Sequence, residues 1–248
     1  MIFDLFLSSL LLCFSLVGIH AYFGRHIIKR GIVFADIAVA QFSGLGIALS
    51  LTFFHEEWAY YLSLTLALLS SLLIAFSQRL SAYSEAFIGL LYALGFSATV
   101  LVLSLSAHGM EEFKRLTAGD LLFVPVHEVI KACLFYAFVG LLLHMRELFL
   151  KGFLKELSFF ILFSLTLTSS VKLAGILVVF SLLLAPALFS ILLEKGLFTA
   201  WLWGTFWSFL GIVLSFKFDL PTGYTVAFLQ ALSTGFVFCL KMVKKGYS

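Results

Sequence analysis

Charged residues are scarce in this sequence, and their scarcity argues against an ordinary soluble domain. Of 248 residues only 12% are charged, while 62% are hydrophobic and 17% aromatic. Soluble domains carry about 25% charged residues. Proline is rare too, with three residues against 30 phenylalanines, and the mean hydropathy is +1.12. The apolar runs do not alternate with polar residues as the strands of a transmembrane barrel do. These features predict an all-α integral membrane protein.

Several motifs of catalysis and cofactor binding are also missing. The three cysteines, Cys13, Cys133 and Cys239, lie far apart and form no zinc or disulfide pattern. The sequence contains no GxxxxGK[ST] phosphate loop, no HExxH and no GxSxG. We therefore expect no enzymatic activity and no cofactor in this chain. The net charge of +3 is spread over several loops, so no nucleic-acid partner is expected.

Nine stretches approach the roughly 20 apolar residues that a membrane-spanning helix needs. They are residues 5–23, 32–54, 58–76, 86–106, 126–145, 157–170, 171–193, 197–216 and 224–240. The region 157–193 is long for one span and short for two. We expect two helices with a turn at residues 168–172, and eight spans are the alternative. The whole chain, 1–248, is predicted to form one polytopic membrane domain.

Positive charges indicate the orientation, because Lys and Arg concentrate in cytoplasmic loops. With the N-terminus outside and the C-terminus in the cytoplasm, eleven of the 16 Lys and Arg residues lie in inner segments. No Lys or Arg precedes the first span, so a signal peptide is not expected. We expect a multi-pass protein of the cell membrane.

The second span, GIVFADIAVAQFSGLGIALS (residues 31–50), carries one carboxylate, Asp36, and one amide, Gln41. Ionisable groups are costly in a membrane and commonly mark a pathway. Asp36 is therefore a candidate pathway residue and a weak metal ligand. The alternative is a hydrated group, or one paired with Lys29 or Arg30. Gln41 is about 140° around a helix from Asp36, so the two do not share a face, and Gln41 lines the pathway at another height or bonds to a neighbouring helix.

Other polar residues suggest weaker sites. Glu85, at the start of the fourth span near Arg79, is either an interfacial anchor or a pathway gate. His55, His108 and His127 lie in or near outer loops and could together form an outer metal-collecting site. Interfacial polar residues without a ligand are the alternative for these histidines.

A short amphipathic segment, RELFLKGFLKE (residues 146–156), separates the fifth and sixth spans. It suits either a helix lying flat on the membrane or a docking helix for a cytoplasmic partner. The candidate docking residues are Arg146, Phe149, Lys151 and Phe153.

Five segments occur in an order that resembles one protein family. They are GIVFADIAVAQ (31–41), SEAFIGLLYAL (84–94), HGMEEFKRLTAGDLL (108–122), VKLAGILVVFSLLLAPALFS (171–190) and DLPTGYTVAFLQ (219–230). Together they are similar to the membrane permease of metal-uptake ABC transporters of the zinc, manganese and iron class. The resemblance covers most of the chain.

The resemblance implies a fold like that of type II ABC importers and a homodimer with the pathway at its two-fold axis. It further implies two cytoplasmic ATPase subunits, which hydrolyse the ATP, and an external metal-binding protein that delivers the cargo. It places ATPase coupling at residues 146–156. We expect the chain to move a divalent transition metal by alternating access. Alternatives are a permease for a metal chelate, siderophore or cobalamin, and a gradient-driven secondary transporter.

The sequence departs from the family pattern in two places. Many zinc and manganese members carry Asp-x-x-x-His in the second span, whereas this chain has Asp36 followed by Ala40 at the histidine position. The coupling segment is also shorter than usual. The resemblance therefore does not assign the metal.

Overall fold

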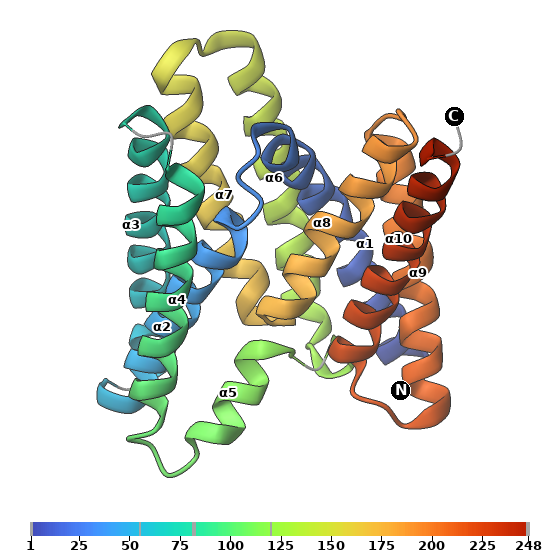
Figure 1. Ribbon diagram of the computed structural model, residues 1–248. Coiled ribbons are helices and arrows are strands. Elements are labelled where there is room, and N and C mark those ends of the chain that lie inside the picture. The colour runs from blue at the N-terminus through green and yellow to red at the C-terminus, as the bar shows by residue number, and fades with distance from the viewer. Residues whose placement is uncertain (1, 55, 81–82, 120, 247–248) are drawn as a thin grey trace. The chain divides into compact units, whose positions relative to one another are not determined.

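The computed structural model describes residues 2–54, 56–80, 83–119 and 121–246, and every regular element in those ranges is a helix. This confirms the all-α prediction. The helices are α1 (Ile2–Arg30), α2 (Ala35–Phe53), η1 (Glu56–Trp58), α3 (Ala59–Leu80), α4 (Ser84–Leu103), α5 (Gly109–Thr117), η2 (Leu121–Phe123), α6 (Val126–Phe149), α7 (Gly152–Ala174), α8 (Ile176–Leu192), α9 (Leu197–Phe218) and α10 (Thr222–Gly246) (Figure 1).

Within the described ranges, eight helices are long and apolar enough to cross a membrane: α1, α2, α3, α4, α6, α7, α9 and α10. The apolar helix α8 has 17 residues, which is the lower limit for a span. Eight long spans and one short apolar helix therefore occupy the nine regions expected from the sequence. The chain is a multi-span membrane protein.

The boundary between the sixth and seventh apolar regions is not where the sequence pattern placed it. The predicted turn at residues 168–172 is wrong, because α7 continues through Ala174 and ends at Gly175, whose φ is +84°. Within the predicted turn, the hydroxyl of Ser170 donates to the carbonyl of Thr166 one helical turn back. Only glycine adopts such a φ without strain, so the helix ends at Gly175.

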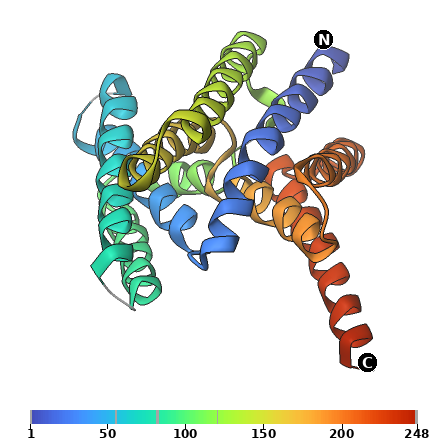
Figure 2. The same ribbon diagram turned by 90° about the horizontal axis from the view of Figure 1, so that it is seen from above.

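The chain divides into two compact units. Unit 1 comprises Met1–Lys29, Ala118–Tyr136 and Leu177–Ser248, and unit 2 comprises Arg30–Thr117 and Ala137–Ile176. In unit 2, α2 lies against α3, α4 and α7, and α3 also contacts α7. Figure 2, in which the ribbon is turned by 90°, shows α3 and α4 of unit 2 side by side.

The helix α5 covers one end of unit 2. Its Phe113 and Leu116 pack with Ile47 and Ala48 of α2 and with Leu103 of α4. The apolar face of α5 explains why it folds back onto the bundle rather than extending away.

In unit 1, close backbone packing brings α1 against α8 and α9. A Cβ on Gly24 would lie 2.0 Å from the carbonyl oxygen of Leu183, and one on Gly204 would lie 2.6 Å from Val17. The buried amide of Gln230 on α10 donates to the carbonyl of Gly204 at 2.6 Å. Small residues and an interhelical amide therefore hold α1, α8, α9 and α10 together, as is typical in membranes.

Many Ser and Thr hydroxyls inside the helices bond to their own backbone. Each donates to a carbonyl three or four residues earlier, as do Ser15, Ser70, Ser77, Ser97, Thr99, Thr166 and Ser181. A hydroxyl bonded in this way needs no partner outside its helix. Polar residues along a span are thereby accommodated without breaking the helix.

Candidate functional site

The helix α2 carries the candidate pathway residues and is buried on most of its faces. Its small residues allow this: a Cβ on Gly44 would lie 3.2 Å from Ile176, and one on Gly46 would lie 2.4 Å from the backbone of Ser63. The hydroxyls of Ser43 and Ser63 are 2.7 Å apart and hydrogen-bond α2 to α3. Small residues thus allow α2 to pack closely against its neighbours.

Asp36 lies in the first turn of α2 and is 1% exposed. Neither carboxylate oxygen has a hydrogen-bond partner among the described residues. Arg30, one of the two partners considered for it, pairs with Glu156 instead, at 3.6 Å. The positive end of the α2 dipole is favourable for a carboxylate at this position, but a buried anion without a partner is costly. Asp36 therefore stays a candidate pathway residue, buried and without a side-chain counter-ion among the described residues.

Gln41, on the same helix, is 7% exposed and faces α4. A Cβ added to Gly95 of α4 would lie 3.0 Å from the Cβ of Gln41. Since Gln41 meets Gly95 and Ile47 meets Leu103, residue numbers rise together along the two helices, which therefore run parallel. Gly95 was not among the residues predicted from the sequence. Its small size is the only sequence feature that could have indicated the close approach of α2 and α4.

Glu85 occupies the first turn of α4 and is half-buried. Its Oε2 atom is buried and has no hydrogen-bond partner in the described part of the chain. The side chain of Arg79, its suggested partner, lies outside the described residues. Because α2 and α4 are parallel, Asp36 and Glu85 lie toward the starting ends of adjacent helices, and both carry unpartnered carboxylate oxygens.

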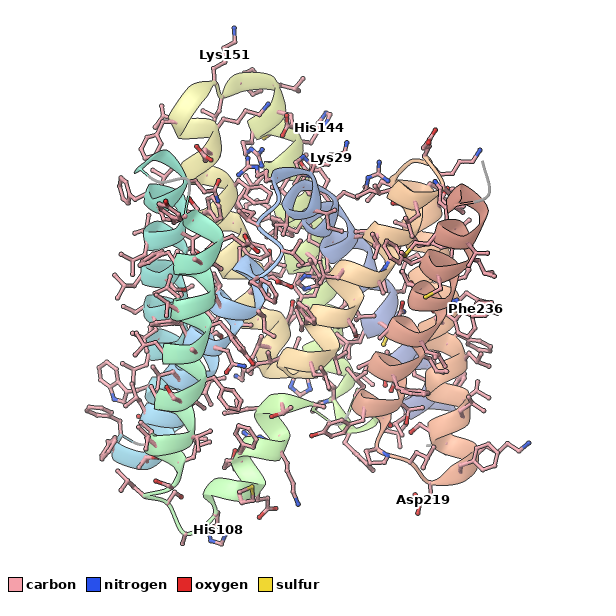
Figure 3. The ribbon with its side chains drawn as sticks, in the orientation of Figure 1. Lys29, His108, His144, Lys151, Asp219 and Phe236 are labelled. Atoms are coloured by element: carbon pink, nitrogen blue, oxygen red, sulfur yellow. The ribbon has the colours of Figure 1, made fainter. Side chains whose placement is uncertain are left out.

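The histidines form no metal-binding cluster within the described residues. No group of three His, Cys, Asp or Glu side chains is placed to hold a metal ion within the described ranges. His127 lies 3.2 Å from the carboxylate of Glu128, and His108 lies in the segment before α5 (Figure 3). His55 lies outside the described residues, so the outer metal-collecting site remains a prediction.

The segment 146–156 is not a separate helix. It contains the end of α6, a break at Leu150 and Lys151, and the start of α7, which we call the α6–α7 hairpin. Gly152 has a φ of +57°, which only glycine adopts readily, and this explains the sharp change of direction. The expected continuous amphipathic helix is therefore wrong in form.

The four candidate docking residues differ in exposure. Phe149 is 73% exposed, and Lys151 projects from the hairpin (Figure 3). Phe153 is half-buried, with its ring centroid 6.0 Å from that of Phe76 on α3. Arg146 is only 4% exposed, so its expected place on an open docking surface is wrong. Its guanidinium packs inward, 5.2 Å from the ring centroid of Phe159.

The ionic partner of Arg146 was not predicted from the sequence. Arg146 donates to Glu147 at 2.8 Å, and Lys155 also pairs with Glu147. Phe159 lies one helical turn after Lys155 and Glu156 on α7, a spacing that could have indicated contacts with the end of α6.

Comparison with known proteins agrees with this geometry. The sequence profile of the ABC 3 transport family matches residues 3–243. No curated protein sequence matches the chain closely enough to count as a relative.

Two solved structures share its fold. One is PsaBC from Streptococcus pneumoniae in complex with Fab, with a TM-score of 0.75, 18% identity and coverage of 94% of this chain and 91% of that chain. The other, described as a metal-chelate type ABC transporter in an inward-facing conformation, has a TM-score of 0.69, 17% identity and coverage of 96% and 85%. The resemblance drawn from the five sequence segments is thereby confirmed, and the chain belongs to the ABC 3 transport family and has the fold of an ABC transporter permease.

Proposed function

We propose that this chain is the permease of an ABC importer for a divalent transition metal ion, with zinc, manganese and iron as the candidate cargoes. The observation that carries the proposal is Asp36, a buried carboxylate in the central helix of unit 2 whose two oxygens have no hydrogen-bond partner among the described residues. Carboxylate oxygens are hard ligands that attract divalent cations. A single carboxylate with few supporting ligands binds weakly, as a conduit requires for release.

The proposal includes the partners that the family pattern implies. Two copies of the chain form a homodimer around the pathway, two ATPase subunits dock beneath it, and an external binding protein delivers the metal. The exposed Phe149 and Lys151 of the α6–α7 hairpin suit a docking surface for the ATPase. With α8 as a ninth crossing, the N-terminus lies outside and the C-terminus in the cytoplasm, as the charge distribution favours.

A permease for a metal chelate is the second candidate. Its support is the lack of any three-ligand metal cluster within the described residues, since a chelated metal already carries its ligands. The fold shared with a metal-chelate type transporter is compatible with this cargo. A gradient-driven transporter is set aside, because the family is that of ABC transporters.

The experiment is uptake into proteoliposomes that contain the chain with candidate ATPase and binding-protein partners. Accumulation of zinc, manganese and iron is measured with ATP, and an ATPase-dead partner serves as the control. ATP-dependent uptake of one free metal is expected. An intact complex that takes up a metal only as a chelate would favour the second candidate, and failure of the chain to assemble with any ATPase would contradict both.

A further inference from the structure

Charged side chains of the α6–α7 hairpin form a connected cluster around one aromatic ring in unit 2. The cluster consists of Arg30, Arg146, Glu147, Lys155, Glu156 and Phe159, and we call it the hairpin ion cluster. The guanidinium carbons of Arg30 and Arg146 lie 4.7 Å and 5.2 Å from the centroid of the Phe159 ring. Two cations thus interact with a single aromatic ring.

Ion pairs connect this aromatic centre to the hairpin on both sides. Arg30 reaches Glu156 at 3.6 Å, and each side chain is about a quarter exposed, at 28% and 27%. On the other side, Arg146 donates to Glu147 at 2.8 Å, and Glu147 also pairs with Lys155. The contacts therefore run without interruption from the last turn of α6, through the first turns of α7, to Arg30.

Arg30 is joined by a very short linker to the helix that carries Asp36. It is the last residue of α1, and only residues 31–34 separate it from Ala35, the first residue of α2. The amide of Ala35 donates to the carbonyl of Ile32 at 3.0 Å, which ties the linker to the first turn of α2. This short linker connects Arg30 to the start of α2, where Asp36 lies.

The hairpin ion cluster also has unused bonding capacity. The Nε and Nη1 atoms of Arg146 are buried and have no hydrogen-bond partner among the described residues. Arg146 can therefore take a further acceptor while it keeps its bond to Glu147.

We propose that Arg30 and Glu156 are positioning residues that transmit movement of the α6–α7 hairpin to α2 and thereby to Asp36. The inference rests on the proposed function, since it assigns how ATPase movement at the hairpin reaches the pathway. Neither residue touches the cargo, and neither belongs to the exposed docking surface of Phe149 and Lys151.

The test uses the complete complex of permease, ATPase and binding protein in proteoliposomes. The variants are Arg30→Gln, Glu156→Gln and the double variant, and the readout is metal transported per ATP hydrolysed. We expect each single variant to lower this ratio about fivefold or more, the lower end of typical coupling between linked sites. The double variant should lose no more than the worse single variant, because one shared contact is removed in all three.

Two controls separate transmission from folding. Glu128→Gln removes an ion pair of the same kind, with Lys131 at 2.9 Å on α6, that is not connected to the linker before α2, and it should leave the ratio unchanged. Glu156→Asp retains the charge and should recover part of the coupling. ATPase co-purification and Tm should be retained in Glu156→Gln and Arg30→Gln.

Specific results would overturn the inference. An unchanged ratio in Glu156→Gln or Arg30→Gln, or additive losses in the double variant, would show that this contact does not transmit the movement. If one single variant fails to fold, the other still decides the question. A wild-type complex that moves neither metal nor chelate would contradict the proposed function, which is a separate outcome.

Discussion

Gly46 of α2 packs directly against the backbone of Ser63 of α3. A Cβ at position 46 would lie 2.4 Å from both the amide nitrogen and the Cα of Ser63. Since backbone atoms cannot move aside as a flexible side chain can, Gly46→Ala should force α2 and α3 apart. We expect a loss of about 1–3 kcal/mol in stability, seen as a lower Tm of the purified protein in detergent.

The control for this variant is Gly89→Ala in α4. A Cβ on Gly89 would meet nothing within 4 Å, so alanine should be neutral or slightly stabilising through its better helix propensity. Equal Tm values for Gly46→Ala and the wild type would contradict the close approach of the two helices.

Asp36→Asn should lower transport without lowering the stability of the protein. Loss of the charge removes the proposed cation ligand, and uptake should fall about tenfold or more, in line with the strength of contacts to charged groups. The Tm should stay the same or rise, because a buried carboxylate without a partner is costly. Uptake in proteoliposomes and Tm are measured on the same preparation.

Asp219→Asn is the matched control. Asp219 lies in the turn between α9 and α10 (Figure 3) with a φ of +52°, a conformation that asparagine also adopts. Its uptake should equal that of the wild type. Normal uptake in Asp36→Asn would remove Asp36 from the pathway.

Phe149 and Phe153 should respond differently to substitution, although both belong to the predicted docking segment. Phe149→Ala removes an exposed apolar side chain. It should weaken co-purification of the ATPase without changing the Tm. Phe153→Ala removes the aromatic contact with Phe76 and should lower stability by about 0.5–1.5 kcal/mol beyond the loss of buried area. Pull-down of the ATPase and thermal unfolding distinguish the two effects.

An exposed phenylalanine elsewhere provides the reference. Phe236 on α10 is 64% exposed, and Phe236→Ala should keep the ATPase bound. Retention of the ATPase by Phe149→Ala, to the same extent as by Phe236→Ala, would place the docking surface away from the hairpin.

Gly152→Ala should strain the α6–α7 hairpin without any clash. A Cβ at position 152 would meet nothing within 4 Å, but the φ of +57° is unfavourable for alanine, at a cost of about 1–2 kcal/mol. The Tm should fall accordingly. Gly140→Ala within α6, where a Cβ also has open space, should not lower it, and a similar fall in both variants would contradict a backbone origin.

The membrane-spanning helices were predictable from the sequence, because the length of an apolar segment determines whether it can cross a bilayer as a helix. Residues 126–145 and 197–216 were expected as spans and form most of α6 and α9. The end of α7 was not predictable from hydropathy, because Ser170 and its neighbours suggest a turn as readily as a back-bonded helix. The deciding feature is the conformation of Gly175, a backbone property that composition does not reveal.

The sequence indicated the individual residues of the candidate site, but not how they pack against one another. Asp36 and Gln41 stand out in an apolar span, and the structure places both in the buried core around α2. The inward packing of Arg146 was not predictable, since it depends on Phe159 and on Arg30, which is more than 100 residues distant in the sequence. Side-chain chemistry indicated the candidates, but long-range packing decided which of them are accessible.

The hydroxyls that bond to their own helices have a consequence for how this chain enters a bilayer. Insertion into lipid depends on the polar groups that a segment presents after it has become helical. Ser15, Ser77, Ser97 and Thr99 offer their donors to carbonyls on the same helix, so each such helix can leave the insertion machinery before its neighbours have been synthesised. In the part of the chain that the structure describes, the carboxylate of Asp36 has no such partner on α2, and α2 therefore depends on later helices to shelter it.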